Sequence, residues 1–197
     1  MNKLKKGQFG YLQQKKNREI VITVILFFIA FSIYGAGLII KKSNQSAFTI
    51  FAILMCLPAS QYLIRVILYL RARGCSASAR DRIEENIGSL YGEYDLYFTS
   101  YDKNFAISHM VYADGSLYAF TEDEKLQEKT FAAFLDEMMK KGQRKKCGVH
   151  VINDLEKYGK RLNELQALAE KNRDLKAQEA DADRCADLFI LIHSITL

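Results

Sequence analysis

Two long apolar segments near the start of this 197-residue chain constrain its fold more than any other feature. They cover residues 20–40 and 47–70, and the first contains no charged residue. A helix of about 20 apolar residues, each rising about 1.5 Å, crosses the hydrocarbon core of a bilayer. The first segment is also too long for the apolar region of a secretory signal, which has about 7–15 residues. We therefore predict a transmembrane hairpin.

Small residues on the second segment predict how the two helices pack. Ala52, Cys56 and Ser60 recur every four residues and share one helix face. Small side chains at that spacing let two helices approach closely, so we expect this face to contact the first helix. Ser32 and Ala36 are the expected counterparts on the first helix.

Two other residues of the second segment are unusual in a membrane helix. Pro58, the only proline in the chain, predicts a kink. Arg65 lies near the end of the segment, where its long side chain can reach the lipid headgroups. The alternative for Arg65 is a transport or gating role, because charged residues inside membranes are frequently functional. Two helices cannot line a pathway, so that alternative requires an oligomer, and the oligomeric state stays open.

Lysine and arginine flank the two segments unevenly. Six precede the first segment, two lie between the segments, and four follow the second at Arg71, Arg73, Arg80 and Arg82. Positively charged flanks stay on the cytoplasmic side of a membrane. We therefore expect a multi-pass protein of the cell membrane with both termini in the cytoplasm.

Charge divides the chain into a basic and an acidic part. Residues 1–82 hold 13 basic and two acidic residues, whereas residues 83–197 hold 15 basic and 21 acidic residues. The net charges of +11 and −6 give the overall +5. The basic charge thus belongs to the membrane segments, and nucleic acid is not an expected partner. The predicted parts are a basic cytoplasmic segment (1–19), helices at 20–40 and 47–70, an outer loop (41–46), a basic linker (71–82) and a cytoplasmic α/β domain (83–197).

Residue patterns predict an α+β order of β-β-β-α-β-α-β for the cytoplasmic domain. Strands are expected at 94–100, 105–113, 116–121 and 147–152, because these segments are rich in aromatic and β-branched residues. Asp114-Gly115 is a strong hairpin signal. Thr121 and Glu124 form a capping box for a helix that ends at Gly142, and Asp154 begins a second helix. Residues 188–197 are too few to span a bilayer and are expected to form a strand or a short buried helix.

The domain carries no motif that names a reaction. It lacks a phosphate-binding glycine loop, a serine elbow and a zinc-binding helix motif. Cys147 and His150 are the only close sulfur–imidazole pair, but residues three apart on a strand face opposite sides, so no metal site is expected. His109 on a predicted strand is the remaining catalytic candidate. The alternative is that His109 is a packed residue without a catalytic role. These features favour a non-enzyme over an enzyme, and no cofactor is expected.

Residues 105–125 resemble the strand–turn–strand of restriction-endonuclease-like (nuclease-related) domains, which sometimes sit beside membrane helices. The resemblance covers about twenty of the 197 residues. It implies a nuclease-like fold. At the positions of that family's two acids and lysine, this chain has Ser108, Thr121 and Asp123. The resemblance therefore implies a fold without the usual metal-dependent chemistry.

The most unusual surface signal is a basic loop of five cations in seven residues within the acidic domain: Lys140, Lys141, Arg144, Lys145 and Lys146. One reading is that the cations balance the dipole at a helix C-terminus. The other is contact with anionic lipid headgroups or with a membrane-protein partner. No aromatic residues interleave with the charges, which disfavours nucleic acid.

The sequence therefore predicts a membrane-anchored cytoplasmic interaction or regulatory module. The alternative is a membrane-tethered enzyme whose active site is degenerate or unrecognised. A cleft that brings His109 to Asp95 or Glu122 would favour the enzyme.

Overall fold

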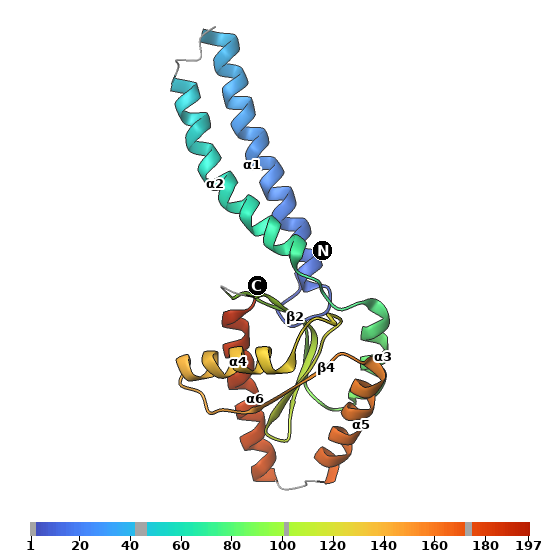
Figure 1. Cartoon of the computed structure of the whole chain (residues 1–197). Coiled ribbons are helices and arrows are strands. Elements are labelled where there is room, and N and C mark those ends of the chain that lie inside the picture. Colours follow the sequence, from blue (N-terminus) through green and yellow to red (C-terminus); the bar gives the residue numbers. More distant parts are fainter. Residues whose placement is uncertain (1–2, 42–46, 101–102, 172–174) are drawn as a thin grey trace. The chain divides into compact units, whose positions relative to one another are not determined.

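The computed structural model describes the backbone of residues 3–41, 47–100, 103–171 and 175–197 (Figure 1). Most of the predicted outer loop, residues 42–46, lies outside the described residues. The chain divides into two compact units. The helical unit contains Gln13–Ala72, and the sheet unit contains the N-terminal residues through Leu12 together with Arg73–Leu197.

The helical unit consists of two long helices, α1 (Tyr11–Lys41) and α2 (Ala47–Arg71). Both are long and apolar enough to cross a membrane, with mean hydropathies of 2.4 and 1.8 over their apolar spans. Only 17% of each apolar window is buried, unlike the core helix of a soluble protein. The two predicted apolar helices are therefore present, and α2 continues through Pro58.

The buried residues of α1 and α2 follow a seven-residue repeat. Within the helical unit, which begins at Gln13, they are Glu19, Thr23, Ala30 and Gly37 on α1, and Ala52, Ala59, Val66 and Tyr69 on α2. Small alanines are buried on a helix only when another element covers them, and within this unit that element is the other helix. Spacings of three, four and seven are typical of two helices that pack along their length.

The residues of the predicted packing face differ in burial. Ala52 lies in the buried stripe, but Cys56 and Ser60 are exposed, and the Ser60 hydroxyl donates to the Cys56 carbonyl oxygen of its own helix at 2.7 Å. Ser32 and Ala36 on α1 are exposed as well. Four residues turn a helix about 40° past one full revolution, so residues spaced by four drift around the helix. Residues spaced by seven stay close to one face, and they form the buried stripe.

The sheet unit is built on a four-stranded mixed sheet with strand order β1-β2-β3-β4. The strands β1 (Gly92–Phe98), β2 (Phe105–Ala113) and β3 (Ser116–Phe120) are antiparallel, and β4 (Gly148–Ile152) is parallel to β3. Asp114 and Gly115 connect β2 to β3 with positive φ angles of 49° and 70°. This two-residue turn confirms the predicted hairpin, because Asp-Gly suits two consecutive residues with positive φ.

Two helices cover each face of the sheet (Figure 1). On one face, α4 (Glu128–Lys141) and α6 (Leu175–Ile195) contribute Phe131, Leu135, Leu188 and Ile192 to the core. On the other face, α3 (Ala77–Ile87) and α5 (Leu155–Lys171) contribute Ile83, Tyr158, Leu162 and Leu165. The unit therefore has two apolar layers separated by the sheet.

The predicted order of elements is wrong at both ends of the domain. The predicted basic linker runs into α3, whose N-cap is Ser76; its hydroxyl accepts the Ala79 N–H at 3.2 Å. At the other end, residues 188–195 belong to α6 and do not form a strand. Only the last two residues pair with β1: Thr196 bridges Phe98, and the Leu197 N–H donates to the Tyr97 carbonyl oxygen at 3.0 Å.

The predicted capping box is also wrong, because Thr121, the residue after β3, hydrogen-bonds to the neighbouring strands. Its N–H donates to the Ile152 carbonyl oxygen at 3.2 Å, and its hydroxyl donates to the Ala106 carbonyl oxygen at 2.7 Å. The helix α4 begins seven residues later, at Glu128, with Gln127 at the N-cap position. A local sequence signal was thus overridden by pairing with β4.

The N-terminal segment lies along β1, the edge strand of the sheet. The Tyr94 N–H of β1 donates to the Gly7 carbonyl oxygen at 2.8 Å, and the Phe9 ring packs edge-on against the Tyr94 ring. Gly7 has a φ of 83°, and a Cβ there would lie 2.6 Å from the Glu93 side chain. This close approach requires glycine. The segment therefore covers backbone groups that an edge strand would otherwise expose.

The side chain of Asp95 on β1 ties together two distant parts of the sheet unit. Its carboxylate oxygens accept the N–H of Gly10 at 2.7 Å and of Cys75 at 2.8 Å. The backbone N–H groups of Tyr11 and Leu12, the first residues of α1, also donate hydrogen bonds to this carboxylate. Burial raises the pKa of Asp95 above its ordinary value, and these N–H donors oppose that rise. One carboxylate thus caps α1 and holds the segment that follows α2.

Asp95 also marks a break in the alternation of β1. Tyr94 packs on the layer of α3 and α5, whereas Leu96 lies in the layer of α4 and α6. Residues two apart on a strand normally share a face, and adjacent ones do not. Asp95 has a φ of 57°, and the faces of Tyr94 and Leu96 around it do not follow a regular pleat. Its side chain is thereby directed to the N–H groups beyond the sheet edge.

We expect Asp95→Gly to destabilise the full-length protein by about 1.5–3 kcal/mol, because buried N–H groups lose a charged acceptor. Glycine adopts a positive φ without strain, so the loss reports the carboxylate and not the backbone. Urea unfolding in detergent micelles, followed by circular dichroism, measures the effect. Asp95→Asn is the matched control, because it keeps one acceptor oxygen and tolerates this φ. Equal midpoints for Asp95→Gly and wild type would contradict the role of Asp95.

Candidate functional site

His109 lies in the core and not in a cleft. It is fully buried, and its Nδ1 lies 2.8 Å from the Tyr158 hydroxyl. The Tyr158 hydroxyl also donates to the Tyr118 carbonyl oxygen at 3.4 Å. Among the described residues, Nε2 has no hydrogen-bond partner. Burial lowers the pKa of His109 to about 3, so the ring is neutral at physiological pH.

The acids that would have completed a catalytic cleft with His109 bond elsewhere. Asp95 accepts the backbone N–H groups described above. Glu122 accepts the N–H of Ser76 at 3.1 Å and its hydroxyl, and so holds the start of α3. His109 therefore acts as a packed core residue.

The positions highlighted by the nuclease resemblance are occupied by structural interactions. The predicted strand–turn–strand is present as β2 and β3. Ser108 and Thr121 are buried, and the Ser108 hydroxyl donates to Glu122 at 3.4 Å. Asp123 accepts the Lys125 N–H at 3.0 Å. Among the described residues, no group of three or more His, Cys, Asp and Glu could hold a metal ion.

Two further candidates are also accounted for by local contacts. The guanidinium of Arg65 lies 5.1 Å from the centre of the Tyr62 ring on the same helix. Cys147 packs on the layer of α4 and α6, while His150 stacks on Tyr118 of the opposite layer with ring centres 5.1 Å apart. The sulfur and the imidazole therefore lie on opposite faces of the sheet, as the strand spacing predicts.

Several cations of the basic loop already have carboxylate partners. Ion pairs join Lys141 to Glu137 at 2.7 Å, Arg144 to Asp187 at 2.9 Å and Lys146 to Asp136 at 2.5 Å. Lys140 and Lys145 make no ion pair within the described part of the chain. The five cations are therefore not equivalent, and Arg144 connects the loop to α6.

A basic pocket of about 300 Å³ lies between this loop and α6. Its basic side chains are Arg144, Lys145 and Lys146 from the loop and Arg184 from α6. The rest of the lining is Tyr112, Gly115, Gln143, Cys147, Asp187 and Leu188. Lys140 and Lys141 lie outside the lining. Four cations thus face one carboxylate, so the pocket is electropositive.

Sequence reasoning did not single out Arg184. It stands in a charged helical segment, about forty residues beyond the loop, and no local pattern distinguishes it from its neighbours. Only the packing of α6 on the sheet brings it to the loop. Within the described residues it makes no ion pair.

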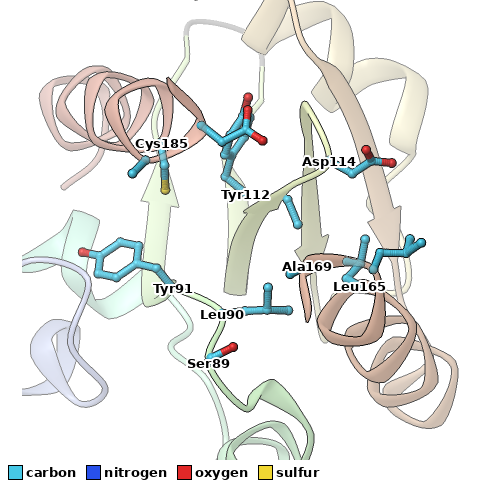
Figure 2. Close-up of a pocket in the computed structure, with 12 residues that line it drawn as sticks. Ser89, Leu90, Tyr91, Tyr112, Asp114, Leu165, Ala169 and Cys185 are labelled. Atoms are coloured by element: carbon cyan, nitrogen blue, oxygen red, sulfur yellow. The ribbon is translucent and has the colours of Figure 1, made fainter. Parts of the chain in front are cut away.

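An apolar pocket of about 300 Å³ is drawn in Figure 2, and it shares Tyr112 with the basic pocket. Figure 2 shows Leu90 and Tyr91 from the segment before β1, Tyr112 at its centre, Leu165 of α5 and Cys185 of α6. The rest of the lining is Ser89, Ala113, Asp114, Leu168, Ala169, Asp181 and Ala182. Its charged residues, Asp114 and Asp181, are both acidic. The charged side chains of this lining are therefore negative, whereas those of the basic pocket are mostly positive.

Tyr112 lines both pockets. Burial raises the pKa of its hydroxyl, the charge of Asp181 adds to this rise, and the charge of Arg184 opposes it. Asp181 belongs to the apolar pocket and Arg184 to the basic pocket. The Tyr112 side chain therefore lies where the electrostatic fields of the two pockets meet.

Known proteins supply no family for this chain. No family model, no curated protein and no solved structure matches it. The ligand of the two pockets therefore has to be inferred from the residues that line them.

The buried His109 predicts a loss of stability in acid. The unfolded chain binds a proton near pH 6.5, whereas the folded state does not do so until about pH 3. Stability is therefore full above the unfolded pKa and falls below it, by up to about 1.4 kcal/mol per pH unit. Urea titrations of the full-length protein at neutral and mildly acidic pH should show a smaller acid loss for His109→Gln than for wild type. The exposed His150→Gln is the matched control, and equal slopes for all three proteins would contradict the assignment.

Proposed function

We propose that the protein is a membrane-anchored binding module whose basic pocket takes a phosphate group. The observation that carries the proposal is the convergence of four cations, from a loop and from a separate helix, on one pocket. Arginine and lysine bind phosphate through charge-assisted hydrogen bonds, and arginine can do so with two parallel bonds. The protein is thus proposed to recognise an anionic ligand at the cytoplasmic face of the membrane.

The membrane anchor in this proposal is supported by the outer surface of the helical unit. Phe28 and Ile39 on α1 are 73% and 80% exposed, and Ile50 and Leu57 on α2 are both 63% exposed. A contiguous apolar surface of this kind is unfavourable in water and suits lipid. The cationic flanks of both helices favour cytoplasmic termini.

The ion pairs of the basic loop do not oppose ligand binding strongly. The Arg144–Asp187 pair has side chains that are 35% and 56% exposed, and such a surface pair is worth about 0–1 kcal/mol. A phosphate can therefore replace Asp187 at Arg144 at small cost. Lys145 and Arg184 have no carboxylate to give up within the described residues. Binding is expected to rest chiefly on these three side chains.

A tethered enzyme gains no comparable support. Its main candidate, His109, is a buried neutral core residue. The two acids expected to act with His109 form other hydrogen bonds. Asp95 accepts the N–H of Gly10, and Glu122 accepts the N–H of Ser76. We therefore keep the binding module as the single proposal.

We expect Arg184→Gln to weaken the binding of pyrophosphate to the full-length protein by about tenfold, since a hydrogen bond to a charged group contributes about 1.5–3 kcal/mol. Lys145→Gln should act in the same direction. Isothermal titration calorimetry in neutral detergent micelles at low salt measures both. Lys140→Gln is the matched control, because this lysine lies outside the pocket. An equal loss for Lys140→Gln, or no binding by wild type, would refute the basic pocket as a phosphate site.

The proposed orientation has a separate test. A fluorescent reporter that matures only in the cytoplasm, fused after Leu197, should be bright, because ten flanking cations outweigh the two between the helices. A reporter enzyme active only outside the cytoplasm serves as the control fusion at the same site. A dark fluorescent fusion together with an active external enzyme would reverse the orientation.

A further inference from the structure

We infer that the two neighbouring pockets bind one ligand, a phosphate ester that carries a partly apolar, nitrogen-bearing group. The phosphate occupies the basic pocket, and the nitrogen-bearing group occupies the apolar pocket. The inference rests on the proposed function, because it keeps the phosphate in the basic pocket. It adds the identity of the rest of the molecule.

The two pockets are neighbours because the same elements of the fold line both of them. Tyr112, near the end of β2, lines both of them. The turn that follows contributes Asp114 to the apolar pocket and Gly115 to the basic pocket. On α6, the adjacent residues Arg184 and Cys185 divide in the same way. Tyr112 therefore forms part of the wall of both pockets, and the inferred ligand extends past it.

The charges of the pockets set the orientation of the ligand. Asp114 and Asp181 repel a phosphate and attract a cation or an N–H donor, whereas the four cations of the basic pocket do the reverse. Complementary charge of this kind discriminates between ligands and fixes their register. A molecule with phosphate at both ends, or with a carboxylate opposite its phosphate, fits this arrangement poorly.

The apolar pocket is suited to a flat or compact organic group. Tyr91 is 59% exposed, and its ring is held in place by an edge-on contact with Phe189 and a hydrogen bond from its hydroxyl to Glu93 at 2.9 Å. Leu165 and Leu168 supply apolar surface from α5. Pre-positioned aromatic rings next to aliphatic side chains are typical of sites that stack a ring or enclose a methylated amine.

The size of the pockets agrees with a small molecule. Each has a volume of about 300 Å³, at the lower end of the range of about 300–1,000 Å³ for small-molecule sites. Together they have room for a phosphate and one organic group. A free nucleotide and the headgroup of a nitrogen-bearing phospholipid share this chemistry, and the experiment separates the two sources.

The test compares matched phosphate compounds on the full-length protein in neutral detergent micelles, by isothermal titration calorimetry. The probes are adenosine monophosphate with ribose phosphate as its parent, and phosphorylcholine with inorganic phosphate as its parent. We expect one nitrogen-bearing ester to bind about tenfold tighter than its parent, since its organic group adds contacts with the aromatic and aliphatic side chains of the apolar pocket. An advantage for adenosine monophosphate identifies a nucleotide-type ligand, and one for phosphorylcholine identifies a headgroup.

A pair of variants assigns the two ends of the ligand. Leu168→Trp fills the apolar pocket from a half-exposed position, so it should reduce the affinity of the favoured ester to that of its parent and leave the parent unchanged. Asp181→Asn removes a charge at the same pocket without added bulk and should reduce the same advantage. Arg184→Gln should weaken ester and parent by equal factors. Thermal unfolding of each variant serves as the control for folding.

The outcomes separate this inference from the proposed function. If each ester binds only as tightly as its parent, the two-pocket ligand is wrong, while the phosphate site stands. If Leu168→Trp and Asp181→Asn leave the ester's advantage intact, the apolar pocket is not its binding site, and the inference is refuted. If none of the phosphate compounds binds, the proposed function itself fails.

Discussion

The carboxylate of Asp95 accepts backbone N–H groups from Gly10 and Cys75, which lie 65 positions apart in the chain. The attachment of these two segments to the sheet depends on this interaction. It holds the segment before α1 and the segment after α2 against the edge strand β1, and Gly7 can then pair with Tyr94. The sheet unit therefore contains both chain segments that enter and leave the apolar helices. An aspartate with a positive φ is uncommon in a strand. In Asp95 this backbone conformation is stabilised by the hydrogen bonds that its carboxylate accepts.

The same sheet positions the two pockets at its other end. The tight Asp114–Gly115 turn ends the β2–β3 hairpin, and the basic loop between α4 and β4 comes beside it because β4 pairs with β3. Helix α6 packs across the face that carries Tyr112 and closes both pockets. The core between these ends is held by large buried groups, among them the His109–Tyr158 pair, whose burial leaves it no accessible chemistry.

Sequence reasoning succeeded where the signal was local and strong. The two long apolar helices, the Asp-Gly hairpin and the amphipathic α5 were all predicted correctly. It failed where a long-range contact outweighed a local preference. Thr121 is a good N-cap residue, but its N–H pairs with Ile152 of β4. The apolar run at 188–195 is compatible with a strand, yet Leu188 and Ile192 lie four apart on one face of a helix that covers the sheet.

By itself, the sequence determined the apolar helix pair, the hairpin of the sheet and the basic loop, because each follows from composition or spacing within a few residues. Only the tertiary structure decided which cations can act together. Arg144, Lys145 and Lys146 meet Arg184 through the packing of α6, while Lys140 and Lys141 lie outside the pocket. It also paired that pocket with the apolar pocket beside Tyr112. Pockets are formed by side chains from separate elements, and the positions of those elements are set by contacts between residues far apart in the chain.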